Sequence, residues 1–157
     1  MSSTRDEWFA DTGDEENLRV FLTRQPLDPV LMINFVKSPK CGAVVYFGGT
    51  TRDSMGDKGV VHLSYEAYVP MALKTLTKIA HEAREKWSQV HRVGIVHRLG
   101  PVPVCEESVI ITVSASHRKQ AWQAGEWILE RIKESLEIWK DEKYDDGSHS
   151  WKENQST

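Results

Sequence analysis

Apolar residues repeat along the chain with two different periods, and segments of the two kinds follow one another. Short apolar runs rich in β-branched residues predict strands at 18–22, 41–47, 60–67, 93–100 and 108–115. Apolar residues spaced three or four positions apart predict helices at 29–37, 71–88 and 117–143. Four or five strands interleaved with three helices are typical of an α/β or α+β fold.

Local features indicate where these elements begin and end. Asp28 before Pro29 is typical of a helix start, since Asp can cap free N–H groups and Pro lacks one. Ser38-Pro39 would end that helix. The connections expected elsewhere are a Gly-rich turn at 48–53, loops at 54–59 and 101–107, and a hairpin turn at Asp146-Gly147.

One domain over residues 18–153 accounts for these elements. Residues 1–17 are acidic and rich in turn formers, so we expect them to form a disordered arm, and residues 154–157 to form a short tail. A chain of 157 residues with 39% hydrophobic residues is large enough to bury a substantial core.

Composition excludes several classes of function. A net charge of −3 argues against a general nucleic-acid binder, although a local basic site stays compatible with it. No apolar run approaches the ~20 residues of a membrane helix, and the N-terminus lacks a secretory signal. Cys41 and Cys105 have no metal-ligand or redox spacing, so we expect reduced, packing thiols in a cytosolic protein.

The longest predicted helix has an unusual first turn. Ser116 is a good N-cap residue, and His117, Arg118 and Lys119 follow it. The helix dipole is already positive there, so added cations favour an anion site. A solvated first turn with its basic side chains in water explains the sequence equally well.

Three other features have a chemical and a structural interpretation. Gly48-Gly49 before Arg52 would let backbone and guanidinium approach an oxyanion, but it lacks a P-loop ending and also fits a plain turn. Lys133 and Lys140 would share one side of the helix beside apolar residues, where a lysine pKa can fall; snorkelling is the alternative. His97-Arg98 could belong to a site, but we interpret it as a surface pair at a strand end.

Several stretches together resemble the large, catalytic subunit of molybdopterin synthase. They are 42–52, 63–68, 96–100, 116–125, Lys133 and 139–142. The resemblance covers roughly residues 18–153. It implies a single α/β hammerhead-like domain (α+β), with a mixed, largely antiparallel sheet and about three helices.

The resemblance also implies an activity and partners. A homodimer of large subunits would bind two small ubiquitin-like sulfur carriers, forming a heterotetramer. The carrier's C-terminal Gly-Gly thiocarboxylate would deliver sulfur to cyclic pyranopterin monophosphate, creating the dithiolene of molybdopterin. No cofactor or metal on the large subunit is implied.

By the same resemblance, His117 and Arg118 would contact the pterin substrate, and Lys133 would position the thiocarboxylate and stabilise or protonate an oxyanion. The other implied substrate-pocket residues are Arg52, Lys140, Asp141 and Glu142. Lys140 is expected to be catalytic with Lys133, and Phe47 to form a pocket wall or ordinary core.

Two positions depart from the family pattern. Glu137 stands where a proline is common, so the helix is expected to run further, which affects the placement of Lys140. Ser150 stands where some members have an arginine, and Lys152 is a candidate replacement.

Two other functions stay open. One is a non-catalytic binding module for a ubiquitin-like partner, against which the joint presence of His117, Arg118, Lys133 and Lys140 argues. The other is an unrelated phosphate-ligand enzyme or RNA-binding domain, supported only by local basic clusters.

Overall fold

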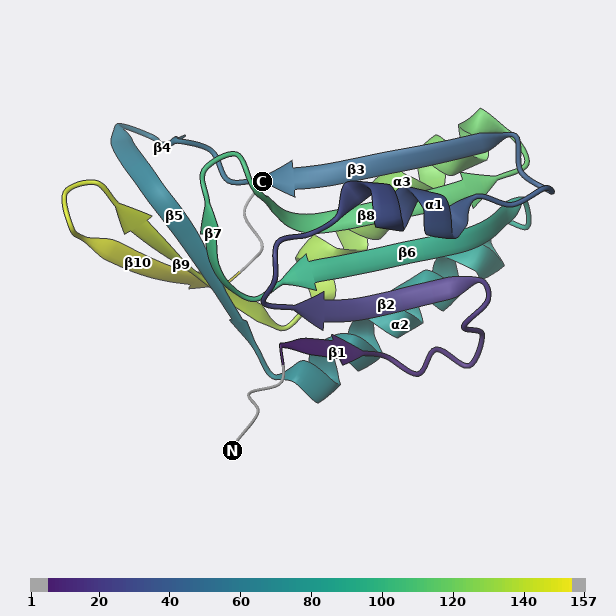
Figure 1. The fold of residues 1–157 in the computed structure, drawn as a ribbon, viewed down its shortest axis with the longest axis horizontal. Coiled ribbons are helices and arrows are strands. Elements are labelled where there is room, and N and C mark those ends of the chain that lie inside the picture. The colour runs from purple at the N-terminus through teal and green to yellow at the C-terminus, as the bar shows by residue number, and fades with distance from the viewer. Residues whose placement is uncertain (1–5, 154–157) are drawn as a thin grey trace.

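The computed structural model describes residues 6–153, which form three helices and two five-stranded sheets. The two sheets meet at an angle and differ in size (Figure 1). This arrangement confirms the predicted mixed, largely antiparallel α+β class. No helix in the described range is long and apolar enough to cross a membrane.

The large sheet contributes many of the buried aliphatic residues, among them Leu18, Val93 and Ile95. Its strands lie in the order β1 (Glu7–Phe9), β2 (Leu18–Thr23), β6 (Val90–Arg98), β8 (Glu107–Ala115) and β3 (Ala43–Thr50). β2 and β6 run parallel, and the other neighbours run antiparallel. β3 is therefore an edge strand.

The small sheet is built around β5 (Lys58–Ala67), the longest strand. Its antiparallel partners are β4 (Ser54–Met55), β7 (Gly100–Pro103) and β9 (Ile138–Tyr144), and β10 (His149–Glu153) pairs with β9. The expected hairpin turn joins β9 to β10, where Gly147 has a φ of +86°.

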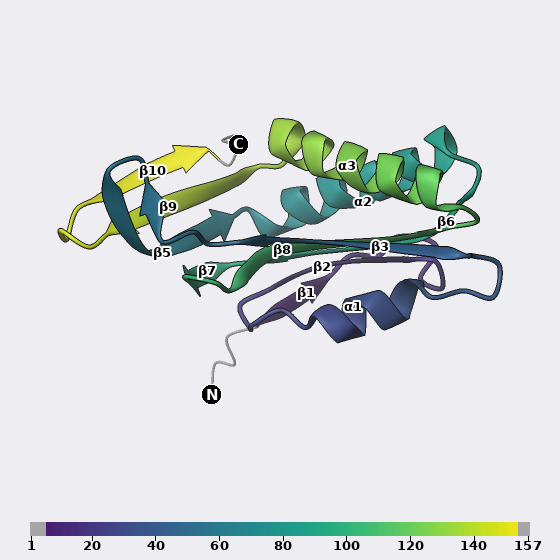
Figure 2. The same cartoon turned by 90° about the horizontal axis from the view of Figure 1, so that it is seen from above.

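The helices cover both faces of the large sheet (Figure 2). α2 (Val69–Lys86) and α3 (Arg118–Ser135) lie on one face, and α1 (Pro29–Val36) lies on the other. α1 begins as expected, since the Asp28 carboxylate accepts a hydrogen bond of 3.2 Å from the Leu31 N–H. α2 buries a continuous stripe of Ala72, Leu76, Ile79, Ala80 and Ala83.

The prediction of a disordered acidic arm is wrong for residues 6–17, while residues 1–5 lie outside the described range. β1 adds a strand to β2, and the Thr12 hydroxyl donates to the Leu18 carbonyl. Arg84 pairs with Asp14 at 2.8 Å. Hydrogen bonds from Asn17 and the Arg84 guanidinium hold the pKa of Asp14 below its ordinary value. Specific polar contacts thus fix a segment whose composition suggested disorder.

The end of the third helix also differs from the prediction. α3 ends at Ser135, and residues 138–144 form β9, so Glu137 does not prolong the helix. The Glu137 carboxylate instead accepts a hydrogen bond of 3.0 Å from Thr75. At the other end the N-cap is His117, without a side-chain capping bond, rather than Ser116.

Segments expected to be loops or turns form strands instead. β3 extends to Thr50, so both glycines of the expected turn lie inside it. The loops at 54–59 and 101–107 contain β4 and β7, which pair with β5. Pairing with the long β5 outweighs the weak local preference of these short segments.

Candidate functional site

A cavity of about 170 Å³ lies where the two sheets and the C-terminal part of α3 meet. Its walls come from β3, β5, β6, β8, β9 and α3. The side chains that matter for its chemistry are Phe47, Arg52, Tyr65, His97, Lys133 and Lys140. Four of the residues selected from the sequence therefore line one cavity: Phe47, Arg52, Lys133 and Lys140.

The two lysines reach the cavity from different elements. Lys133 is half-buried in the last turn of α3, whereas Lys140 belongs to β9 and is 6% exposed. The expectation that they share a helix face is wrong, because the chain changes from helix to strand between them. They converge because alternate residues of β9 face inward.

The third cation stands at the rim. Arg52 is exposed just after β3, and β3 approaches β8 closely there: a Cβ at Gly49 would lie 2.9 Å from Val109 Cγ1. A side chain at 49 would collide with the Val109 side chain unless that side chain moved. The glycine thus serves close strand packing, and Arg52 stands at the cavity rim.

Lys140 rests on a buried carboxylate. Its Nζ lies 3.7 Å from Glu142 Oε1, while Glu142 Oε2 accepts hydrogen bonds from Tyr144 (2.6 Å) and Lys152 (3.2 Å). Glu142 is fully buried. Burial would raise its pKa, but the hydrogen bonds from Tyr144 and Lys152 and the charges of both lysines hold the pKa below its ordinary value.

The charged groups around Lys140 also shift the pKa of its amine. Burial lowers the pKa of Lys140, and the positive charges of Lys152 and Lys133 lower it further, against the opposing effect of Glu142. Lys140 therefore releases a proton more readily than an exposed lysine. Lys152, a candidate replacement for the missing arginine, contacts this carboxylate.

Two of the predicted pocket residues, both on β9, do not line the cavity. Asp141 faces the opposite side of β9 and accepts a hydrogen bond from His149 Nδ1 at 3.1 Å. Glu142 contacts Lys140, which lines the cavity, but does not line it itself. Strand alternation accounts for Asp141, because consecutive β9 residues face opposite sides, whereas Glu142 shares the inner face with Lys140.

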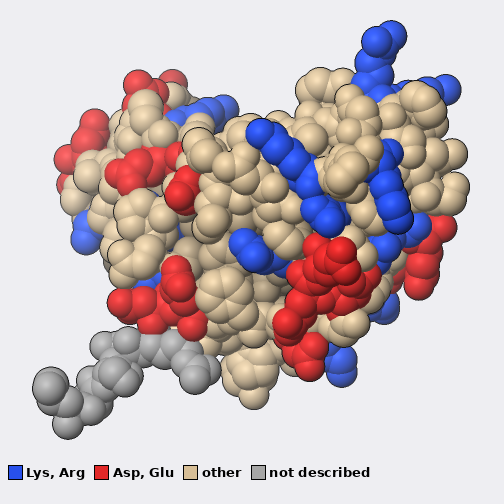
Figure 3. Space-filling model, turned by 45° about the vertical axis from the view of Figure 1, so that its right-hand side comes forward, with Lys and Arg blue, Asp and Glu red and all other residues tan. Residues whose placement is uncertain are grey.

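His117 and Arg118 lie far from this cavity within one chain. Both are exposed at the start of α3, whereas Lys133 is near its end. At about 1.5 Å per residue, the helix separates Arg118 from Lys133 by about 22 Å. Figure 3 shows Lys and Arg side chains gathered beside acidic ones at the end of the molecule where α3 begins. One chain alone cannot place these residues in the pocket with the lysines.

A residue that was not assigned to the site from the sequence also lines the cavity. His97 is 1% exposed rather than on the surface, and its ring packs edge-on against Tyr65 at 4.9 Å. Burial lowers the pKa of His97 to about 4, and burial raises the pKa of Tyr65. Arg98 is also buried and pairs with Glu106 at 2.9 Å. The signal available in the sequence was a His-Arg pair at the end of an apolar strand.

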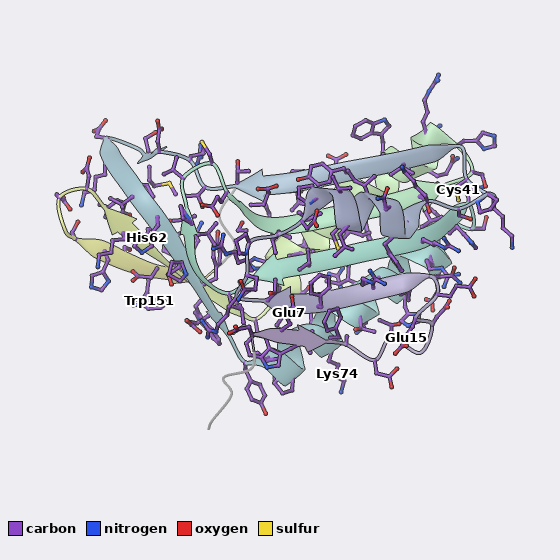
Figure 4. All side chains as sticks on the ribbon, in the orientation of Figure 1. Glu7, Glu15, Cys41, His62, Lys74 and Trp151 are labelled. Atoms are coloured by element: carbon purple, nitrogen blue, oxygen red, sulfur yellow. The ribbon has the colours of Figure 1, made fainter. Side chains whose placement is uncertain are left out.

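The cysteines lie outside this arrangement. Both thiols are free; Cys41 is partly buried, but Cys105 is exposed, so the expected packing role is wrong for Cys105. Figure 4 shows Cys41 at the end of the large sheet away from the small sheet, which carries His62 and Trp151. Within residues 6–153, no group of three or more His, Cys, Asp or Glu side chains is placed to hold a metal ion.

Comparisons with known proteins agree on one family. Residues 22–135 match the family model described as MoaE protein. The chain is 50% identical over 143 residues to the molybdopterin synthase catalytic subunit of Aspergillus niger, covering 91% of this chain and 79% of that protein. The corresponding Aspergillus clavatus subunit is 47% identical, with 91% and 72% covered.

Solved structures share the fold. Molybdopterin synthase from Staphylococcus aureus superposes with a TM-score of 0.80 at 39% identity, covering 83% of this chain and 94% of that one. A complex of subunits 1 and 2 of molybdopterin-converting factor from Helicobacter pylori is similar in fold, with a TM-score of 0.71 at 21% identity and 87% and 92% covered. The chain therefore belongs to the MoaE family, whose curated relatives are the catalytic subunits of molybdopterin synthase.

Proposed function

We propose that this enzyme of molybdenum cofactor biosynthesis takes sulfur from the C-terminal thiocarboxylate of a small ubiquitin-like carrier. The acceptor is cyclic pyranopterin monophosphate, and the product is the dithiolene of molybdopterin. The observation that carries the proposal is the convergence of Lys133, Lys140 and Arg52 on one cavity between the sheets. Both reactants are anionic, so this charge suits their joint binding.

The cavity can lower the barrier to sulfur transfer in two ways. Lys133 would hold the thiocarboxylate and stabilise the oxyanion that forms at its carbon, since a fixed cation is most effective where water is excluded. Lys140, whose pKa is lowered, would supply a proton to the departing group. Phe47, Val109 and Leu129 contribute an apolar wall that limits water.

A small subunit is the partner that this mechanism requires. The H. pylori neighbour is a complex of two subunits of molybdopterin-converting factor, which supports a two-subunit assembly here. A Gly-Gly tail carries no side chains, so it is the narrowest peptide segment that could enter the cavity. The cytosolic location expected from the sequence stays a prediction.

A second copy of the chain would bring His117 and Arg118 to the site. β3 is an edge strand, and exposed apolar residues lie on and beside it, including Val44 (40% exposed) and Trp122 (63%). A twofold axis across β3 would set the start of one β3 beside the end of the other. Because Gly42 N–H bonds to the Ser116 carbonyl at 3.3 Å, the start of α3 would follow the start of β3 toward the partner's cavity.

Product formation with a thiocarboxylated small subunit and cyclic pyranopterin monophosphate, followed by mass, tests the activity. We expect Lys133→Ala to lower the rate about 100-fold or more, as for loss of an oxyanion-stabilising group. Lys74→Ala, an exposed lysine of α2, is the matched control and should keep the wild-type rate. Carrier binding without product from the wild type would instead favour the non-catalytic binding module.

Mixing two inactive variants tests the shared site. Arg118→Ala and Lys133→Ala should each be inactive, but hybrid dimers would contain one site with both residues. Random exchange makes half of the dimers hybrid, so about a quarter of the wild-type activity should return. A mixture that stays inactive while size measurements show exchanged dimers would disprove the contribution of Arg118 from a partner copy.

A further inference from the structure

The floor of the cavity contains one polar side chain in an otherwise apolar row. At the end of the large sheet, Gly49 pairs with Val109, Val109 with His97 and His97 with Leu22. His97 follows Val93 and Ile95 on the face that packs against the helices. A leucine or valine would fill this position in a purely structural strand, yet a buried imidazole occupies it.

A hydrogen bond fixes which ring nitrogen carries the proton. His97 Nδ1 lies 2.8 Å from the carbonyl oxygen of Arg98. A carbonyl can only accept, so the neutral ring donates from Nδ1 and keeps the lone pair on Nε2. Nε2 lies at the tip of the side chain, away from the backbone. On this residue, which lines the cavity, one ring nitrogen is therefore anchored and the other carries a lone pair.

The surroundings keep this ring neutral at ordinary pH. Ionisable groups around the cavity are Tyr65 on β5, Lys133 on α3, Lys140 on β9 and Arg52 after β3. Three are cations, and the buried hydroxyl of Tyr65 keeps its proton because its pKa is raised. Burial disfavours a protonated imidazole at this position and lowers the pKa of His97 to about 4. At neutral pH the ring is therefore unprotonated, so its Nε2 can accept a proton.

Sulfur transfer from a thiocarboxylate needs such a base. When the thiocarboxylate sulfur bonds to a carbon of the acceptor, an oxygen substituent leaves that carbon with the electron pair of its C–O bond, and the carrier becomes linked to the acceptor by an acyl–sulfur bond. Water must then attack the acyl carbon; the carbon–sulfur bond breaks, the electron pair and sulfur stay with the acceptor, and the carrier leaves as a carboxylate. The proton lost by the attacking water has to be accepted.

We propose that His97 is the general base of this hydrolysis, accepting through Nε2 the proton of the water that cleaves the acyl–sulfur link. The inference rests on the proposed function and adds one residue with one step. In this mechanism Lys133 and Lys140 stabilise negative charge, and His97 activates the attacking water.

Variants of His97 separate this role from packing. In His97→Asn the amide nitrogen can still donate to the Arg98 carbonyl, but no group replaces Nε2. In His97→Gln the amide reaches the Nε2 position and accepts a hydrogen bond but cannot take a proton. His91→Asn, in the same strand and outside the cavity, is the matched control. Unfolding curves first establish which variants are folded.

We expect the folded His97 variants to form product about 100-fold more slowly or worse, and a carrier–pterin adduct to accumulate in intact mass spectra. In His97→Ala, added imidazole should discharge the adduct, with a rate that follows its neutral fraction. A wild-type rate in His97→Gln, or slow product without an adduct and without rescue, would overturn the proposal. Absence of product from the wild type would contradict the proposed function itself, which separates the two failures.

Discussion

The two sheets enclose interiors of different chemistry. Against α2 and α3, the large sheet presents aliphatic residues such as Leu18, Val93 and Ile95, with His97 at its end. The inner face of the small sheet includes Lys140, Glu142 and Tyr144. The first interior is stabilised by apolar burial, whereas the second depends on every charge finding a partner. The cavity lies where these two interiors meet.

The difference explains where reactivity can reside. A buried ammonium is costly unless a carboxylate compensates it, and Glu142 compensates Lys140 incompletely, since burial still lowers the lysine pKa. The large sheet supplies the rigid frame that makes such a position tolerable. We therefore expect changes in the two interiors to affect stability and activity in different proportions.

Removing the buried carboxylate should have the largest effect. Glu142→Gln leaves the ammonium groups of Lys140 and Lys152 without their shared counter-charge, which should lower the free energy of unfolding by about 3–5 kcal/mol. Denaturant unfolding would measure it, with exposed Glu130→Gln on α3 as the matched control. A loss below about 1 kcal/mol would mean that the cluster is not energetically coupled.

A cavity created in the interior of the large sheet should lower stability without lowering activity. Ile95 is fully buried, and Ile95→Ala should lower the free energy of unfolding by about 3 kcal/mol. The rate of product formation per folded molecule should change less than about twofold, because Ile95 does not line the cavity. If the rate per folded molecule fell as much as in Lys133→Ala, the distinction between the two interiors would be lost.

Acid should destabilise the fold partly through His97. Its pKa is about 4 in the folded chain and higher when unfolded, so the unfolded state binds a proton first as pH falls. Between about pH 7 and about pH 5, this difference in pKa should lower the free energy of unfolding by roughly 2 kcal/mol. His97→Gln should remove that part of the pH dependence of stability. If the free energy of unfolding depended on pH in the same way for wild type and variant, burial would not lower the pKa of His97.

The exposed ion pair between the two sheets should contribute least to the free energy of unfolding. Arg24, just after β2, pairs with Glu66 of β5 at 3.3 Å, and both side chains are close to half exposed. Glu66→Gln should lower the free energy of unfolding by less than about 1 kcal/mol, and salt should reduce the effect. A larger loss that persists in high salt would indicate that this pair joins the sheets more strongly than an exposed bridge does.

Local sequence features predicted the frame well. Asp28 caps α1, and the apolar stripe of α2 with Leu76 and Ala80 is buried as its spacing indicates. These elements depend on contacts between residues close in sequence. The strands of the large sheet are recognisable for a related reason, since nearly every inward position is apolar.

The small sheet was harder to predict because its inward positions are polar. In β9 the buried residues are Ile138, Lys140, Glu142 and Tyr144, a period of two that a hydrophobicity pattern does not reveal. No Pro or Gly separates Ser135 from Ile138, so helical spacing seemed to continue. Pairing with β5, far away in sequence, decides the strand. The same polar alternation hid the outward direction of Asp141.

The two-residue link between α3 and β9 makes the active site sensitive to chain length rather than to composition. Inserting or deleting one residue between Leu136 and Ile138 would exchange the two faces of β9 against β5, turning Lys140 to solvent and Trp139 or Asp141 inward. Natural variation in length should therefore be tolerated in the hairpin at Asp146 and excluded at this link. A sequence can keep both lysines and still lose the site through a single-codon indel.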